Sequence, residues 1–129
     1  MTIRILMVDD EPDAQELFRQ NFRREIRKRI YDFEFAGSGE QALDILRNGT
    51  PPEILMLLSD VNMPGMSGME LLEKVRKAWP EVGVFMITAY GDAATEGQAK
   101  SLGAANFFAK PVDFVRLKDE LARAVGAPA

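Results

Sequence analysis

The chain has neither cysteine nor histidine among its 129 residues. Without histidine, it cannot use serine-histidine catalysis, bind zinc through imidazole or form a phosphohistidine of its own. Without cysteine, it has no disulfide, no thiolate nucleophile and no thiolate metal site, which fits a reducing compartment. The groups left for chemistry are carboxylates, hydroxyls, amides and ammonium groups.

Long hydrophobic runs are also missing. No apolar stretch approaches the ~20 residues that span a bilayer. The apolar run at 3–8 is short and leads into acidic residues, unlike a signal peptide. We therefore expect a cytoplasmic protein without a membrane partner. The net charge of −4 argues against nucleic-acid binding by the domain as a whole.

The length fits a single domain, which we assign to residues 1–126, with 127–129 as a frayed end or the stub of a linker. Short apolar runs alternate with helical patterns, which is typical of an α/β protein with a parallel sheet. The predicted strands cover residues 3–8, 33–36, 54–59, 82–88 and 106–109. The predicted helices cover residues 12–30, 39–47, 68–79, 93–102 and 113–125.

Polar side chains stand where four of these strands end. Asp9 and Asp10 follow the first strand, Asp60 follows the third, Thr88 ends the fourth and Lys110 follows the fifth. Ligands of open α/β sheets bind outside the carboxyl ends of the strands, beside the point where the strand order reverses. We therefore expect these side chains to form one site at that edge.

The chemistry of this set suits a phosphoryl group and a hard cation. A carboxylate can attack phosphorus to form an acyl phosphate, so Asp60 is the candidate nucleophile. Mg²⁺ prefers carboxylate oxygen, which Asp9 and Asp10 offer. Lys110 could offset phosphoryl charge, and the Thr88 hydroxyl could donate to a phosphoryl oxygen.

Each of these residues also has a purely structural interpretation. Asp60 could be a turn aspartate, and Asp9 could be a helix N-terminal acid favoured by the macrodipole. Lys110 could be an exposed lysine before a proline, and Thr88 an ordinary strand residue. What favours the functional interpretation is that all of them fall at one predicted edge.

Four short motifs carry a family resemblance. In chain order they are Val8-Asp9-Asp10-Glu11, Asp60-x-x-Met63-Pro64-Gly65-Met66-x-Gly68, Ile87-Thr88-Ala89 and Lys110-Pro111. On this strand pattern they resemble the receiver (response-regulator) domain of two-component signal transduction, over about residues 3–125. The resemblance implies a doubly wound, flavodoxin-like sheet of five parallel strands in the order 2-1-3-4-5, with helices on both faces.

The resemblance also implies roles for individual residues. Asp60 would accept a phosphoryl group from a phosphohistidine on a sensor histidine kinase or a histidine phosphotransfer protein. Lys110 would contact that group, and its bond to Pro111 is often cis in the family. The Mg²⁺ ligands would be carboxylates and one backbone carbonyl, with Asp10 as the main ligand; the full set is Asp9, Asp10, Asp60 and Asn62 through its carbonyl.

The implied output is a change of surface. Thr88 and Phe107 would move together when Asp60 is phosphorylated, altering the face formed by residues 93–102, 106–109 and 113–125. This face would regulate an effector protein or a fused output domain, and could form a homodimer. We expect slow autodephosphorylation and a switch rather than a turnover enzyme.

Three other functions fit the sequence less well. An aspartyl-phosphate phosphatase usually has an acid two residues beyond its nucleophile, where this chain has Asn62. A flavodoxin-like electron carrier needs a phosphate-binding loop after the first strand, where Asp9, Asp10 and Glu11 would repel phosphate. A degenerate receiver used as a scaffold is disfavoured by the complete set of site residues.

Two features depart from the usual pattern. About two additional residues lie between Pro52 and Asp60, which predicts a late start or a bulge in the third strand. The predicted helix 12–30 is long and has a basic side, which is either a solvated face or a docking site for an acidic partner. Its cations are Arg19, Arg23, Arg24, Arg27, Lys28 and Arg29.

Overall fold

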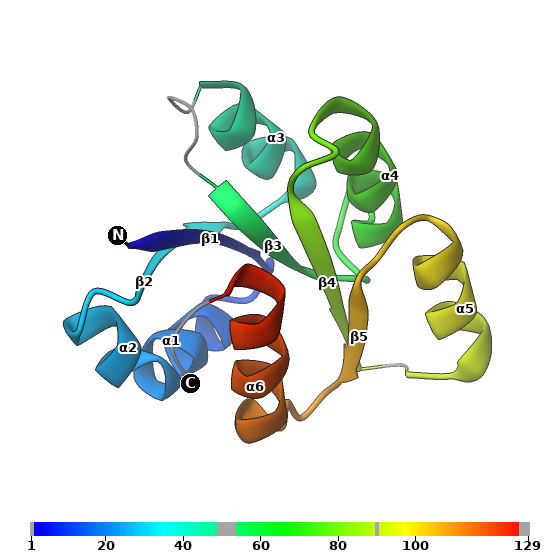
Figure 1. Ribbon diagram of the computed structural model, residues 1–129. Helices are drawn as coiled ribbons and strands as arrows, with labels where there is room; N and C mark the ends of the chain where they lie inside the picture. Colours follow the sequence, from blue (N-terminus) through cyan, green and yellow to red (C-terminus); the bar gives the residue numbers. More distant parts are fainter. Residues whose placement is uncertain (1, 49–53, 90, 127–129) are drawn as a thin grey trace.

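A five-stranded parallel sheet forms the centre of the computed structural model, which describes residues 2–48, 54–89 and 91–126 (Figure 1). The strand order is β2-β1-β3-β4-β5, and every neighbouring pair is parallel, as predicted. The strands are β1 (Ile3–Val8), β2 (Tyr31–Ala36), β3 (Ile54–Asp60), β4 (Gly83–Thr88) and β5 (Asn106–Ala109).

Helices cover both faces of the sheet (Figure 1). They are α1 (Pro12–Asn21), α2 (Arg23–Arg27), α3 (Gly39–Asn48), α4 (Gly68–Ala78), α5 (Ala93–Ser101) and α6 (Phe114–Val125). Buried side chains of α1 and α6 pack on one face, and those of α3, α4 and α5 pack on the other. Because successive strand residues point to opposite faces, Ile5 and Met7 belong to the first core cluster, and Leu6 and Val8 to the second.

The helix predicted over residues 12–30 is wrong in its length and continuity. Phe22, with φ −100° and ψ 11°, separates α1 from α2. Apolar periodicity continues past this residue and therefore could not reveal the break. Hydrogen bonds from the Phe22 amide to the Phe18 carbonyl and from the Ile26 amide to the Phe22 carbonyl, both 2.9 Å, still link the two helices.

α2 ends in a Schellman-type turn. Arg29 has a φ of 59°, and its amide donates to the Ile26 carbonyl at 3.0 Å. The Ile30 amide donates to the Glu25 carbonyl at 2.9 Å. The turn reverses the chain, so that β2 begins at Tyr31, two residues before its predicted start.

Of the late start or bulge predicted for the third strand, the structure shows an irregularity in the pairing, whereas β3 begins at Ile54. Arg4 of β1 pairs with Ile54, but Ile5 pairs with Met56, so the backbone of one additional residue is accommodated between them. From Met56 onward the pairing with β4 is regular and aligns Asp60 with Ile87. The irregularity therefore stays at the amino end of β3, away from the predicted site.

Serine side chains cap the amino ends of α3 and α4. The Ser38 hydroxyl accepts from the Gln41 amide at 3.0 Å, and the Ser67 hydroxyl accepts from the Glu70 amide at 3.2 Å. No helix of the described ranges has the length and apolarity needed to cross a bilayer. Residues 127–129 lie outside these ranges, and the assignment of 1–126 as one domain stays a prediction.

Candidate functional site at the carboxyl edge of the sheet

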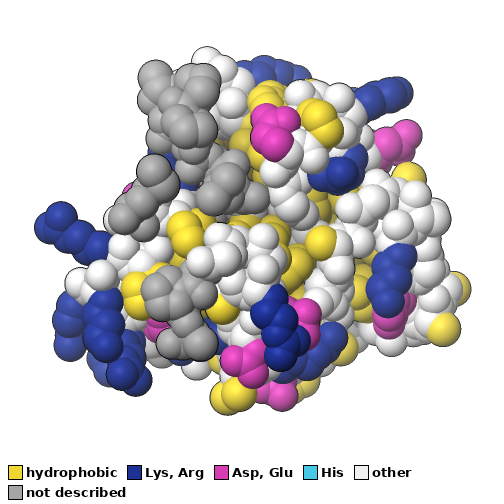
Figure 2. Space-filling model, in the orientation of Figure 1, with side chains coloured by type: hydrophobic (Ala, Val, Ile, Leu, Met, Phe, Trp, Pro, Cys, Tyr) yellow, Lys and Arg dark blue, Asp and Glu magenta, His cyan; other side chains and the backbone are white. Residues whose placement is uncertain are grey.

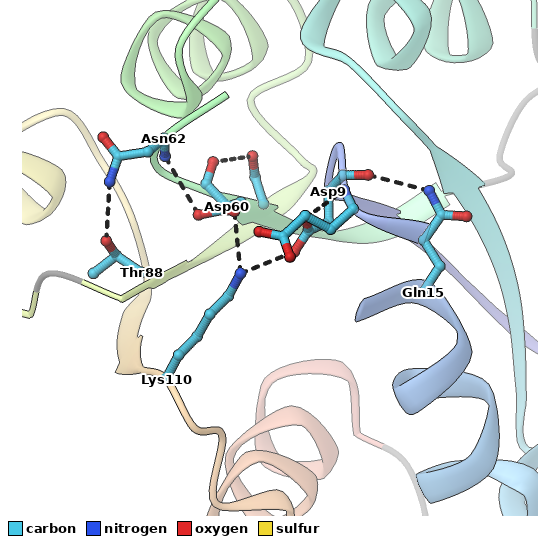
Figure 3. A network of polar contacts seen from close by, with 8 residues as sticks. Asp9, Gln15, Asp60, Asn62, Thr88 and Lys110 are labelled. Atoms are coloured by element: carbon cyan, nitrogen blue, oxygen red, sulfur yellow. Dashed lines mark hydrogen bonds and ion pairs between the residues drawn. The ribbon is translucent and has the colours of Figure 1, made fainter. Parts of the chain in front are cut away.

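The residues predicted to form a site come together at the carboxyl edge of the sheet (Figure 3). Asp9 follows β1, Asp60 ends β3, Thr88 ends β4 and Lys110 follows β5. The Lys110 backbone amide donates to the Thr88 carbonyl at 2.8 Å, which keeps the chain beyond β5 beside β4. The Lys110–Pro111 peptide bond is cis, as expected from the resemblance.

The Lys110 ammonium lies between two largely buried carboxylates (Figure 3). Its Nζ is 3.1 Å from Asp9 Oδ2 and 3.1 Å from Asp60 Oδ2. Asp9 is 0% exposed and Asp60 is 5% exposed, so little water reaches either charge. Without the Lys110 ammonium between them, these two carboxylates would repel each other strongly.

Burial and charge act in opposite directions on these groups. Burial raises the pKa of the Asp60 carboxyl, and the hydrogen bond and charge of Lys110 offset only part of that effect. Burial alone would lower the pKa of Lys110, but the hydrogen bonds that its ammonium donates to Asp9 and Asp60, together with the charges of these carboxylates, raise it. Lys110 therefore stays an ammonium at neutral pH, and ionised Asp60 depends on it.

Backbone and side-chain donors hold the two carboxylates in place. Asp9 Oδ1 accepts from the Glu11 amide at 2.9 Å, and Asp60 Oδ1 accepts from the Asn62 amide at 3.3 Å. The Gln15 side chain, on α1, donates to the Asp9 carbonyl at 3.1 Å. Gln15 was not predicted as part of the site, because an amide one turn into a helix carries no distinctive sequence signal.

Gly68 allows α4 to begin directly against the phosphoacceptor candidate. A Cβ at this position would lie 1.9 Å from the Asp60 carbonyl oxygen, and the Gly68 amide donates to the Val61 carbonyl at 2.8 Å. Any larger residue would push α4 away from the end of β3. The glycine of the Asp60–Gly68 motif therefore sets the backbone next to the site.

Thr88 and Phe107 lie on the other face of the sheet from the charged residues. By strand alternation, Asp60 continues the set of Met56 and Leu58, which pack toward α1 and α6. Thr88 is fully buried, and its hydroxyl accepts a 3.4 Å hydrogen bond from the Asn62 side-chain amide (Figure 3). Phe107 is 6% exposed and belongs to the core cluster under α3, α4 and α5.

The acidic residues fit a magnesium ion. One carboxylate oxygen from each of Asp9, Asp10 and Asp60 lies within 4.8 Å of the other two. Opposite ligands of octahedral Mg²⁺ are about 4.2 Å apart, so these oxygens need only a small adjustment. The Asp10 side chain is exposed and makes no hydrogen bond to the part of the chain that the structure describes, which leaves its oxygens available.

A cavity of about 410 Å³ opens over the site. Its charged side is formed by Asp9, Asp60 and Lys110, and its apolar side extends along α1 to Leu17 and Phe18. A ligand approaching Asp60 would therefore pass over a partly apolar surface.

Comparison with known proteins identifies the family. The family model described as response regulator receiver domain matches residues 5–122. The chain belongs to this family. The match begins within β1 and covers the other four strands, and membership agrees with the fold and the position of the acidic residues.

Individual relatives support the same conclusion. Sporulation initiation phosphotransferase F of Bacillus subtilis is 34% identical over 119 residues, which cover 92% of this chain and 90% of that protein. Response regulator protein PilR of Pseudomonas aeruginosa is 34% identical over 122 residues, 95% of this chain. That alignment covers only 26% of PilR, so the receiver domain spans about a quarter of that relative's length.

Solved structures share the architecture. A CheY-like response regulator receiver domain protein from Methanospirillum hungatei superposes with a TM-score of 0.86 at 27% identity, covering 98% of this chain and 95% of that chain. Response regulator protein TrrA from Thermotoga maritima, in complex with Mg²⁺ and BeF, gives a TM-score of 0.79 at 29% identity, covering 95% and 99%. Membership of this family favours a phosphorylation-dependent switch over the electron-carrier alternative.

Proposed function

We propose that this receiver domain is a switch that is set by phosphorylation of Asp60. The phosphoryl group would come from a phosphohistidine of a sensor histidine kinase or a histidine phosphotransfer protein. The observation that carries the proposal is the Lys110 ammonium, 3.1 Å from both Asp60 and Asp9 at a largely buried edge of the sheet. Such an ammonium is placed to stabilise negative charge that gathers at Asp60.

The transfer forms one bond and breaks another. A carboxylate oxygen of Asp60 forms a bond to phosphorus, while the bond from phosphorus to the donor's imidazole nitrogen breaks. The bonding electrons leave with that nitrogen, which takes a proton and becomes neutral histidine. Lys110 supplies positive charge on one side of the reacting group. The Thr88 hydroxyl, which now bonds to Asn62, would donate to a phosphoryl oxygen only after the group is attached to Asp60.

Magnesium is the cofactor that the acidic residues fit. Asp10 would be the main carboxylate ligand, with Asp9, Asp60 and the backbone carbonyl of Asn62 completing the protein's share. When bound, Mg²⁺ supplies charge that offsets the phosphoryl oxygens and the clustered carboxylates. Asp9 would assist the magnesium site mainly through the position of its charge, because the Glu11 amide and Lys110 already donate hydrogen bonds to its two oxygens.

The signal would leave the site through Thr88 and Phe107. Both lie on the face of the sheet that α5 covers. A shift of the Thr88 hydroxyl toward the phosphoryl group would therefore change the packing of α5 and β5. The Phe107 ring is already buried in this structure. The unphosphorylated protein can therefore already adopt the arrangement that phosphorylation would favour. Phosphorylation would raise the population of that conformation of the α5–β5–α6 surface.

The side chain of Asn62 argues against a phosphatase with rapid turnover. Its amide cannot act as a general acid, and it donates to Thr88 instead. We therefore propose slow autodephosphorylation. The partners at the output surface would be an effector protein, a fused output domain or a second copy of the domain. We place the protein in the cytoplasm, with no nucleic-acid or membrane contact by this domain.

Acetyl phosphate with Mg²⁺ tests the proposal directly. Intact-mass measurement should detect one added phosphoryl group on the wild-type domain and none on Asp60→Asn. Asp119→Asn, which changes an exposed acid on α6, is the matched control and should be labelled like the wild type. Equal labelling of the Asp60→Asn variant would end the assignment of Asp60 as phosphoacceptor.

A further inference from the structure

A cluster of basic side chains covers α2 and the turn that follows it. It consists of Arg23, Arg24, Arg27, Lys28 and Arg29, all of which are exposed. Figure 2 shows Lys and Arg side chains gathered at the lower left of the molecule, where Figure 1 places α2. We call this surface the basic face. It concentrates positive charge on a chain whose net charge is −4.

The cations of α2 point away from the protein. At 3.6 residues per turn, the four positions from 23 to 28 that carry them span roughly 140° of the helix circumference. The opposite side carries the buried Phe22 and the half-buried Ile26. The acid of this segment, Glu25, is turned toward α6, where its carboxylate lies 3.1 Å from the Lys118 ammonium.

The cations of the basic face lack counterions. Several exposed cations elsewhere pair with an acid three or four residues away, as in Arg19–Glu16, Arg47–Asp44, Lys100–Glu96 and Arg123–Glu120. Among residues 2–48, 54–89 and 91–126, no carboxylate lies within ion-pair distance of any cation of the basic face. Its charge is therefore available to an external partner.

Arg29 adds a conformational observation. Its φ of 59° lies in the left-handed region, where glycine is favoured and arginine costs about 1 kcal/mol. The side chain is exposed, so packing does not explain a cation at this position. Glycine would make this turn more stable, so the presence of arginine is better explained by its positive charge.

The basic face is remote from the phosphorylation site. α1 begins at Pro12, just beyond β1 at the carboxyl edge, and its ten residues carry the chain about 15 Å back. The turn after α2 lies at the amino ends of the strands, because the Ile3 amide donates to the Ile30 carbonyl at 3.0 Å. A partner at the basic face would leave both Asp60 and the α5–β5–α6 surface accessible.

We propose that the basic face docks an acidic segment of a partner protein, rich in aspartate and glutamate. Four arginines and one lysine suit carboxylates, because guanidinium groups bind them in a bidentate way. No exposed side chain of α2 is aromatic or apolar, so the face offers nothing for base stacking or for insertion into lipid. A long polyanion would also meet the net negative remainder of the domain.

Two variants of equal charge test this proposal. The face variant carries Arg23→Gln, Arg24→Gln, Arg27→Gln and Lys28→Gln. The control variant carries Arg47→Gln, Lys74→Gln, Lys77→Gln and Arg123→Gln, which are exposed residues of α3, α4 and α6. Each lowers the net charge by four, from −4 to −8. Circular dichroism and phosphoryl uptake from acetyl phosphate check that both variants fold and keep the distant site.

The probe is a short fluorescein-labelled polyglutamate peptide, followed by fluorescence anisotropy at low and at physiological salt. The wild type should bind it, with affinity that falls as salt rises. The face variant should bind about tenfold more weakly or worse, while the control variant should stay within about twofold of the wild type.

Three results would overturn the proposal. One is no peptide binding by the wild type at low salt, and another is an equal loss in the face and control variants. The third is tighter binding of a DNA duplex or of phosphatidylserine vesicles than of the peptide, lost in the face variant. These outcomes are independent of the assignment of Asp60, because phosphoryl uptake is measured separately in each variant.

Discussion

Lys110 Nζ and Asp60 Oδ2 are 3.1 Å apart, although 50 residues separate them in the chain. The same nitrogen is 3.1 Å from Asp9 Oδ2. One ammonium thus serves two carboxylates that the sheet brings together from β1 and β3. Its position makes the stability of the metal-free domain depend on a residue that the fold does not need for packing.

Removing this ammonium should destabilise the metal-free domain. In Lys110→Met, two buried carboxylates lose their cation, which should lower the free energy of unfolding by about 2 kcal/mol in EDTA. Mg²⁺ should restore part of the loss, because it replaces the missing charge. Urea unfolding with and without Mg²⁺ measures both effects.

Lys118→Met is the matched control for this variant. Lys118 also forms an ion pair, 3.1 Å from Glu25, but its side chain is 33% exposed and far from the acidic cluster. The expected loss is below about 1 kcal/mol and independent of Mg²⁺. A Lys110→Met variant with the same small, Mg²⁺-independent loss would show that the carboxylates do not need the lysine.

Asp60→Asn should stabilise the metal-free domain at neutral pH. Burial raises the pKa of Asp60, so the folded state disfavours its ionised form. A group with a raised folded pKa contributes stability below its unfolded pKa of 3.8 and loses it as pH rises through the folded value. The variant should therefore be about 1 kcal/mol more stable at pH 7 in EDTA.

This advantage should shrink as the pH falls toward 4, where Asp60 of the wild type takes up a proton. Thermal unfolding across that pH range measures the difference, with Asp119→Asn as a control of equal charge at an exposed position. A difference that grows toward acid would mean that Asp60 is held ionised in the fold.

Thr88→Val should separate phosphorylation from its consequence. The hydroxyl lies on the opposite face from Asp60's core neighbours and bonds to Asn62, so uptake from acetyl phosphate should persist. Phosphorylation-dependent changes in hydrogen exchange at α5 and β5 should be lost, while Thr88→Ser retains them. Unchanged responses in the valine variant would exclude the hydroxyl from signal transmission.

Two glycines should respond oppositely to alanine. A Cβ at Gly68 would lie 1.9 Å from the Asp60 carbonyl oxygen, so Gly68→Ala should cost about 3 kcal/mol. A Cβ at Gly97, within α5, would meet no atom within 4 Å apart from the helix's own backbone, and alanine should stabilise by about 1 kcal/mol. Denaturant midpoints of both variants test this; a tolerated Gly68→Ala would mean that α4 can move away from β3.

Arg29→Gly should raise stability by about 0.5–1 kcal/mol, because it relieves the left-handed backbone of a non-glycine residue. Arg29→Ala removes the same charge but keeps the Cβ, so it should show no such gain. Thermal unfolding of the two variants distinguishes backbone conformation from charge, and equal midpoints would contradict the conformational explanation.

Strand positions were predictable because each apolar run stops at a polar residue. Asp60, Thr88 and Lys110 are where the sequence placed them, each next to a strand end. The alternation of side chains along a strand can be counted from the sequence, and it already places Thr88 and Asp60 on opposite faces of the sheet. Only the structure shows which helices cover each face.

Local backbone geometry was less accessible. The Schellman-type turn at Arg29 could not be predicted, because its left-handed residue is not the expected glycine or asparagine. The hydrogen bond from Gln15 to the Asp9 carbonyl and the close approach of Gly68 to Asp60 depend on tertiary packing. Sequence patterns therefore located the side chains of the candidate site but not the atoms that hold them in place.

The irregular pairing near the start of β3 affects how the domain tolerates changes of length. An additional residue before Met56 is absorbed there, and the remaining strand keeps its alignment with Gly83–Ile87. An insertion between Met56 and Asp60 cannot be absorbed in this way, and would turn the Asp60 carboxylate toward α4 and away from Lys110. Natural or engineered length variation should therefore concentrate upstream of Met56.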